Sequence, residues 1–161
     1  MELLLVRHGK AVDARSATSD EDRWLTRGGR VTVTKVGEAL AQRDLQYSCI
    51  YTSPLVRAVQ TAEILAATHP HFQGPVKVLP ALSIEVGGTA EALEPLEDAS
   101  DGDLIVMVTH MPKIGMLAEH LCKYASALSF RTSSTCLLSI ERGKGHIEWM
   151  LDPETLAFHH H

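Results

Sequence analysis

Two short runs of consecutive apolar residues limit most strongly how this chain can fold. Residues 3–6 (Leu-Leu-Leu-Val) and residues 104–108 (Leu-Ile-Val-Met-Val) contain no polar side chain. Each run is shorter than an ordinary helix, and a strand with an unbroken apolar run is typical of a sheet that is covered on both faces. The five apolar residues of the second run therefore predict a buried, central strand.

The rest of the chain alternates between strand-like and helix-like segments as far as residue 123. Apolar spacing and capping signals predict helices at residues 28–43, 54–68, 89–96 and 112–123. Further strands are predicted at residues 49–52, 76–79, 134–141 and 146–151. This order predicts an α/β fold, a three-layer sandwich with a mostly parallel central sheet, helices on both faces and an antiparallel C-terminal hairpin.

The length of 161 residues predicts a single domain, residues 1–153, followed by a C-terminal tail at residues 154–161. His159, His160 and His161 resemble the remnant of a purification tag, so they play no part in the site argument. The chain shows no linker, repeat or low-complexity segment that would divide it further.

The charge balance restricts the classes of partner. A formal net charge of −5 argues against nucleic acid or an anionic membrane as the main partner. No signal peptide is visible and no run approaches the ~18 apolar residues of a membrane span, so we expect a cytoplasmic protein. Three cysteines without metal-ligand spacing are expected to be buried thiols in a reducing compartment.

One cysteine lies in a pattern that needs its own decision. Residues 136–142 have the Cys-x5-Arg spacing of cysteine phosphatases, whose chemistry needs a Gly-rich loop that wraps a phosphate with backbone N–H groups. Leu137, Leu138 and Ile140 instead indicate a strand. We therefore interpret this pattern as part of the sheet.

Polar side chains follow three of the predicted strands at the point where each strand ends. Arg7 and His8 follow the first strand, Ser53 follows the second along the chain, and His110 comes shortly after the central run. Because ligands of α/β proteins bind outside the carboxyl ends of parallel strands, these side chains are expected to meet at one edge of the sheet.

A helix start adds a further cation to this edge. Ser53 and Pro54 predict that a helix begins there, with a capping hydroxyl and a proline at its first position. Arg57 then lies in the first turn, off the apolar stripe of that helix. Two guanidinium groups, two imidazoles and a helix N-terminus together suit a dianionic phosphoryl group.

The same residues resemble a known family. Arg7-His8-Gly9 is similar to the RHG signature of the histidine phosphatase superfamily, which includes the phosphoglycerate mutases, and residues 53–61 resemble its SP-xx-RA-x-QT segment. Thr109-His110 resembles its second catalytic histidine. The shorter branch of SixA-type phosphohistidine phosphatases matches more closely, through similarities at residues 25–29, 78–82, 110–112 and 130–133. The resemblance spans about residues 2–153 and implies a phosphoglycerate mutase-like fold.

The resemblance also implies a mechanism. His8 would attack phosphorus and form a phosphohistidine intermediate, which water then hydrolyses. Arg7, Arg57 and His110 would hold the phosphoryl oxygens, with Ser53 as a further candidate ligand. Because histidine and arginine take the place of a metal ion, no metal and no cofactor are expected.

The substrate depends on the leaving group. A phosphate ester needs a general acid, whereas phosphohistidine can leave as neutral imidazole after taking a proton from solvent. Ala81 stands where the family pattern has glutamate, and Glu85 is the nearby carboxylate that could serve as the acid. The chain lacks the long insertions that form lids in larger relatives, which favours an open site that admits a side chain of another protein.

Three hypotheses therefore remain. The leading one is a phosphatase that removes phosphate from phosphohistidine on a phosphotransfer protein domain. The second is a phosphomonoesterase of the same superfamily that acts on a small phosphate ester, with Glu85 as its acid. The third is a phosphate-binding module without catalytic activity, against which the presence of both His8 and His110 argues.

Overall fold

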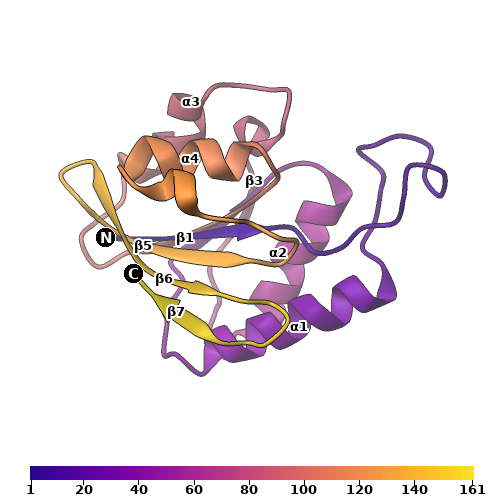
Figure 1. The fold of residues 1–161 in the computed structure, drawn as a ribbon, viewed down its shortest axis with the longest axis horizontal. Coiled ribbons are helices and arrows are strands. Elements are labelled where there is room, and N and C mark those ends of the chain that lie inside the picture. The colour runs from indigo at the N-terminus through magenta and orange to yellow at the C-terminus, as the bar shows by residue number, and fades with distance from the viewer.

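A seven-stranded mixed sheet forms the middle layer of the computed structural model, which describes residues 1–161 (Figure 1). Its strands follow the order β3-β2-β4-β1-β5-β6-β7. The strands are β1 (Glu2–Arg7), β2 (Cys49–Thr52), β3 (Val76–Val78), β4 (Leu104–Thr109), β5 (Thr135–Glu141), β6 (Lys144–Leu151) and β7 (Phe158–His160). The first four of these in spatial order are parallel, and β5 to β7 continue the sheet antiparallel. The central position predicted for residues 104–108 is confirmed, because β4 lies between β2 and β1.

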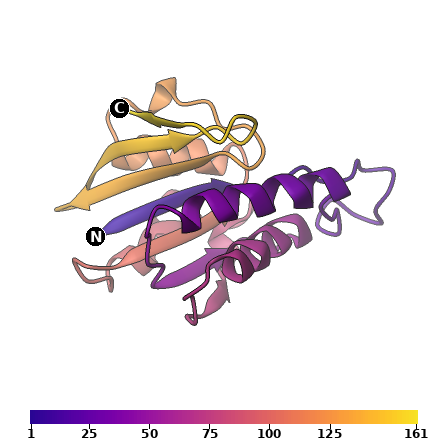
Figure 2. The same ribbon diagram turned by 90° about the horizontal axis from the view of Figure 1, so that it is seen from below.

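Helices cover both faces of the sheet, which confirms the predicted three layers. The helices are α1 (Arg27–Ala41), α2 (Val56–Thr68), α3 (Thr89–Leu93) and α4 (Lys113–Leu121). In Figure 1, α3 and α4 lie above the sheet, and Figure 2 shows α1 and α2 side by side on the opposite face. None of these helices combines the length and the apolar character that crossing a membrane would require.

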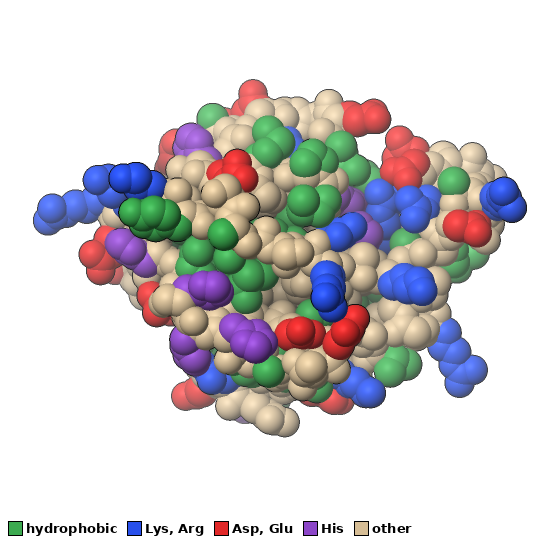
Figure 3. All heavy atoms as spheres, in the orientation of Figure 1, with side chains coloured by type: hydrophobic (Ala, Val, Ile, Leu, Met, Phe, Trp, Pro, Cys, Tyr) green, Lys and Arg blue, Asp and Glu red, His purple; other side chains and the backbone are tan.

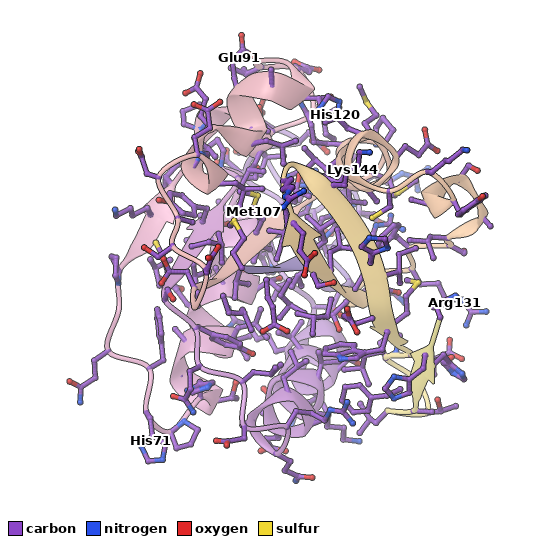
Figure 4. The ribbon with its side chains drawn as sticks, turned by 90° about the vertical axis from the view of Figure 1, so that its left-hand side faces the viewer. His71, Glu91, Met107, His120, Arg131 and Lys144 are labelled. Atoms are coloured by element: carbon purple, nitrogen blue, oxygen red, sulfur yellow. The ribbon has the colours of Figure 1, made fainter.

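The apolar run of β1 serves two separate cores. Leu3 and Leu5 belong to the cluster beneath α3 and α4, while Leu4 and Val6 belong to the cluster beneath α1 and α2. Successive strand side chains point to opposite faces, so a strand between two helical layers needs an apolar residue at every position. The same alternation in β4 sends Met107 into the first cluster, and Figure 4 shows this residue in the middle of the molecule.

Helix α1 begins one residue before the predicted start at residue 28. Thr26 caps the helix, and its hydroxyl accepts a hydrogen bond from the Gly29 amide at 2.9 Å. A Cβ on Gly29 would meet the carbonyl oxygen of Lys10, so the helix approaches the loop after β1 more closely than a larger residue allows. This contact places the N-terminus of α1 beside the end of β1.

Three other elements differ from the prediction. Helix α2 begins at Val56, and its N-cap is Leu55 without a side-chain hydrogen bond, so the expected cap by Ser53 and the first position of Pro54 are both wrong. The segment at residues 89–96 divides into α3 and a 3-10 turn, Glu94–Leu96, because Pro95 lacks the amide that would continue the α-helix. The hairpin turn is tighter than expected, since β6 already begins at Lys144.

The residues beyond 153, expected to be a tail, include a strand. β7 pairs antiparallel with β6, and the Phe158 ring packs edge-on against Trp149 with centroids 4.9 Å apart. The guanidinium carbon of Arg43, just beyond α1, lies 4.4 Å from the centre of the Phe158 ring. Aromatic and cation–π contacts therefore hold this end of the chain on the sheet.

Candidate active site

The carboxyl ends of three parallel neighbours bring the predicted site residues together. Arg7 of β1 is in register with Thr109 of β4, and Thr52 of β2 is in register with Val108 of the same strand. The side chains that follow these ends reach one edge of the sheet, on the right-hand side of Figure 1. Arg7, His8, Arg57 and His110 line one hollow of about 340 Å³, here called the strand-end hollow.

His8 is held in one tautomer. Its Nδ1 lies 2.7 Å from the carbonyl oxygen of Gly9, and because a carbonyl only accepts hydrogen bonds, Nδ1 carries the proton. The Nε2 atom is therefore left with a lone pair, toward which Arg57 Nε donates at 3.4 Å. Burial and, secondarily, the charges of Arg57 and Arg7 lower the pKa of His8 to about 4, so the ring is neutral at pH 7.

His110 forms the second imidazole of the hollow. Its ring centre lies 4.9 Å from that of His8, and the two planes are tilted by 51°. Burial, followed by the nearby His8 and Arg57, lowers the pKa of His110 to about 3. Its Nε2 lies 2.6 Å from the hydroxyl oxygen of Ser53, which also accepts a hydrogen bond from the amide of Leu55.

Ser53 lies behind His110 instead of lining the strand-end hollow. Its side chain is fully buried, and its hydroxyl already accepts the Leu55 amide. The hydroxyl hydrogen is thus free to donate to His110 Nε2, which leaves the proton of that ring on Nδ1. The structure thus relates Ser53 to the orientation of an imidazole, whereas the sequence analysis named it as a helix cap and as a candidate phosphate ligand.

Arg57 is buried, although sequence spacing placed it off the core stripe of its helix. Two of its nitrogen atoms are held by Asp20: one donates to the Asp20 carbonyl at 2.7 Å and the other to the Asp20 carboxylate at 3.1 Å. Arg23 donates to the other carboxylate oxygen at 2.9 Å. Hydrogen bonds from Arg23 and Arg57 hold the pKa of Asp20 below its ordinary value, so this carboxylate is ionised at neutral pH.

Two buried nitrogen atoms of the strand-end hollow have no hydrogen-bond partner. One is Nε of Arg7, whose guanidinium otherwise donates to the carbonyl of Phe130 at 2.6 Å. The other is Nδ1 of His110. Buried polar atoms are rarely left unpaired because each costs about 1–3 kcal/mol. An oxyanion in the hollow would supply acceptors for both.

The loop after β1 is tied to α2 by two polar side chains. Thr61 accepts a hydrogen bond from the amide of Gly9 at 3.0 Å, and Gln60 accepts one from the amide of Leu25 at 2.8 Å. These two residues close the SP-xx-RA-x-QT segment in the sequence. Thr61 thus holds the backbone next to His8, and Gln60 holds the end of the same loop where it leads into α1.

Glu85 lies outside the strand-end hollow. It is exposed and lines a neighbouring hollow of about 270 Å³, here called the acidic hollow, together with Asp20 and Glu21. Asp20 and Ile84 line both hollows. Asp20 is the one carboxylate that lines the strand-end hollow, and neither spacing nor motif singled it out within the polar loop at residues 13–23.

Two other kinds of site are not supported. Cys136 lies fully buried in β5, and burial raises the pKa of its thiol to about 12, so the Cys-x5-Arg pattern belongs to a strand as interpreted. No group of three or more His, Cys, Asp or Glu side chains is arranged as a metal-ligand set. The ionisable side chains that line the strand-end hollow are imidazoles, guanidinium groups, the Lys10 ammonium group and one carboxylate.

Comparisons with known proteins give one family match and two relatives that align with nearly the whole chain. The family model described as "Histidine phosphatase superfamily (branch 1)" matches residues 3–87, more than half of the chain. An uncharacterized protein of a Picosynechococcus strain is 36% identical over 159 residues, which cover 96% of this chain and 93% of that protein. The phosphohistidine phosphatase SixA of Escherichia coli K12 is 28% identical, with coverage of 95% and 94%.

Solved structures show the same fold. A structure of the protein histidine phosphatase SixA complexed with tungstate superposes with a TM-score of 0.86 at 25% identity, covering 98% of this chain and all of that one. A structure described as a putative phosphohistidine phosphatase SixA from Agrobacterium tumefaciens gives a TM-score of 0.79 at 20% identity, with coverage of 94% and 97%. The latter likeness shows the fold alone.

Proposed function

The chain belongs to branch 1 of the histidine phosphatase superfamily, and on that premise we propose that it is a phosphatase that removes phosphate from phosphohistidine on a protein. The observation that carries this proposal is the state of His8: a neutral imidazole whose Nδ1 proton is held by the Gly9 carbonyl and whose Nε2 lone pair faces the Arg57 guanidinium. That arrangement suits a nucleophile that attacks an anionic phosphoryl group.

In the first step, His8 Nε2 attacks phosphorus and forms a P–N bond. The P–N bond of the substrate breaks, and its electron pair returns to the substrate imidazole, which takes a proton from solvent. Arg7 Nε and His110 Nδ1, the two buried nitrogens without partners, donate to the phosphoryl oxygens, and Arg57 adds positive charge beside them.

In the second step, water attacks the phosphoryl group on His8. The P–N bond to His8 breaks, inorganic phosphate departs, and Nε2 regains its lone pair. The depressed pKa of His8 favours this release, because the ring leaves as a neutral imidazole that the folded protein prefers to imidazolium. The enzyme returns to its initial protonation state with one water consumed.

The ionisation of Asp20 supports a phosphoramidate over an ester. An alkoxide leaving group needs a proton donor, and Asp20 is ionised by its contacts with Arg23 and Arg57. An imidazole leaving group needs no such donor from the protein. The likeness to SixA supports the same substrate class, and the complex of SixA with tungstate, a tetrahedral oxyanion like phosphate, supports an oxyanion as ligand of this chain.

The experiment compares two substrate classes without added metal and in the presence of a chelator. Wild type is offered free phosphohistidine and a panel of small phosphate esters, beside His8→Ala and His71→Ala. His71 is the matched control because its ring lies exposed at the edge of the molecule, as Figure 4 shows. We expect turnover of phosphohistidine by wild type and His71→Ala, none by His8→Ala, and an acid-labile phosphoryl group trapped on wild type by alkaline quenching.

Three results would contradict the proposal. Comparable turnover of esters that is lost in Glu85→Gln would assign the chain to the phosphomonoesterases instead. Binding of inorganic phosphate without turnover of either class would leave a phosphate-binding module. Equal turnover by His8→Ala and wild type would remove the proposed nucleophile altogether.

A further inference from the structure

A third hollow adjoins the strand-end hollow, and most of its charged side chains are basic. It measures about 460 Å³, is here called the basic hollow, and shares Lys10 and Thr132 with the strand-end hollow. Lys35 of α1 and Arg131 add two further cations to its wall. Its single carboxylate, Glu154, pairs with Arg131 at 3.2 Å, so Lys10 and Lys35 remain without an ionic partner.

The charge of the basic hollow is opposite in sign to the net charge of the whole chain. The formal net charge is −5, yet the basic hollow carries three cations and one carboxylate. In Figure 3, Lys and Arg side chains gather on the right-hand half of the visible face, and Figure 4 shows Arg131 pointing outward at the edge of the molecule. A local field of the opposite sign attracts an acidic partner to one place on an otherwise acidic protein.

The opposite flank of the strand-end hollow has a different character. The acidic hollow carries three carboxylates, Asp20, Glu21 and Glu85. Two apolar residues that line the strand-end hollow, Ile84 and Met111, are 42% and 41% exposed. The face around His8 is thus polarised: cations on one side, carboxylates on the other, and apolar side chains at the rim.

We propose that this face docks a folded protein domain whose phosphohistidine is flanked by carboxylates, which the basic hollow receives. This inference rests on the proposed function and adds the orientation of the partner: its acidic flank lies over Lys10, Lys35 and Arg131, and its apolar surface covers Ile84 and Met111. The strand-end hollow adjoins one hollow of positive charge and one of negative charge, so a protein that presents phosphohistidine to His8 meets opposite charges on its two sides.

The test uses short synthetic peptides with one histidine phosphorylated by phosphoramidate. Two acidic peptides carry four Glu before or after the phosphohistidine, and matched peptides carry four Gln or four Lys. At low ionic strength we expect kcat/KM for the better acidic peptide to exceed that of its Gln counterpart by about tenfold. The difference should vanish near 0.5 M salt, where screening is effective within a few ångströms.

Charge reversal in the basic hollow should remove the preference. In Lys35→Glu/Arg131→Glu, we expect acidic and Gln peptides to be hydrolysed equally well, while turnover of free phosphohistidine stays at the wild-type rate. The matched control is Lys123→Glu/Lys144→Glu, which makes the same change in net charge at exposed positions near the β5–β6 hairpin; Figure 4 labels Lys144 there. The control should keep the acidic preference.

The outcomes separate the inference from the proposed function. A wild-type enzyme without preference among the peptides, or a preference lost equally in the control, would overturn the docking inference while leaving phosphohistidine turnover intact. Failure to hydrolyse free phosphohistidine would instead overturn the proposed function. A preference for the Lys peptides would reverse the proposed orientation and so contradict it.

Discussion

The neutral state of His8 at low pH is the sharpest consequence of the site geometry. Burial and neighbouring guanidinium groups lower the pKa of His8 to about 4, against an ordinary value of 6.5. At pH 5.5 a free imidazole is only about 9% neutral, whereas a group with a pKa of about 4 is about 97% neutral. The fraction of competent nucleophile should therefore be about tenfold higher at pH 5.5 than solution chemistry predicts.

The direct measurement is an NMR titration of the histidine ring resonances between pH 3.5 and 8. Substitution to Asn assigns the signals of His8 and His110, and free histidine in the same buffer gives the reference curve. We expect both assigned rings to keep their neutral chemical shifts down to about pH 5, and formation of the phosphoenzyme to keep its rate over the same range. A His8 resonance that titrates near pH 6.5 would refute the reasoning.

The lowered pKa of His8 also makes the stability of the folded chain depend on pH. The pKa of His8 is lower in the folded chain than in the unfolded chain, so below pH 6.5 the unfolded chain binds a proton that the folded chain excludes. The folded state is thus destabilised as the pH falls from 6.5 to 4, by about 3 kcal/mol from His8 alone. Substitution of His8 by Asn should flatten that part of the stability profile, as measured by urea unfolding.

Three further changes test individual contacts. Asp20→Asn removes the anion that competes for Arg57, so inorganic phosphate should bind about three- to fivefold more tightly in calorimetric titration; weaker binding would show that Asp20 orients the guanidinium instead. Ser53→Ala leaves His110 Nε2 unpaired, and we expect a loss of about 1–3 kcal/mol in the free energy of unfolding together with slower turnover; an unchanged enzyme would refute the orienting contact. Gly29→Ala pushes a methyl group against a backbone carbonyl, so thermal unfolding should show a loss of at least about 1 kcal/mol.

Matched controls are available in the same segments. Asp22→Asn removes an exposed carboxylate of the same loop that contacts Thr18 and Ser19 and does not touch Arg57, so phosphate affinity should stay unchanged. Gly28→Ala adds a methyl group beside Gly29 where the nearest atom is 4.0 Å away, so stability should be kept or slightly raised. Equal effects in a test variant and its control would point to a general disturbance of the loop.

The meeting of residues from distant parts of the chain could be predicted because topology decides it. Apolar runs identified the buried strands, and parallel neighbours must end at one edge of the sheet, so Arg7, His8 and His110 had to converge once β1 and β4 paired. Helical spacing and capping signals also identified the helix predicted at residues 28–43, which is α1, since both depend on residues close together in sequence.

Features that depend on contacts between distant residues could not be predicted from local sequence patterns. A Ser-Pro pair is a strong signal for a helix start, but at Ser53 the tertiary contact with His110 prevails and the helix begins later. The contact of Asp20 with Arg57 joins an irregular loop to a helix 37 positions away, and no periodicity marks such a pair. Spacing along the helix placed Arg57 off the apolar stripe, and its burial accompanies contacts with His8 and Asp20 that such spacing does not show.

Backbone hydrogen bonds from both neighbours of β1 hold the chain at His8. The His8 amide donates to the carbonyl of Thr109 at 3.0 Å, and the Ser133 amide donates to the carbonyls of Arg7 and His8 at 3.1 and 3.0 Å. The partners in these hydrogen bonds lie about a hundred residues further along the chain. Thr109 ends β4, the parallel neighbour of β1, and Ser133 comes shortly before β5, its antiparallel neighbour. Nascent chains that lack the C-terminal third therefore lack these hydrogen bonds to His8, and activity that depends on them should appear during refolding only after β1 has paired with both β4 and β5.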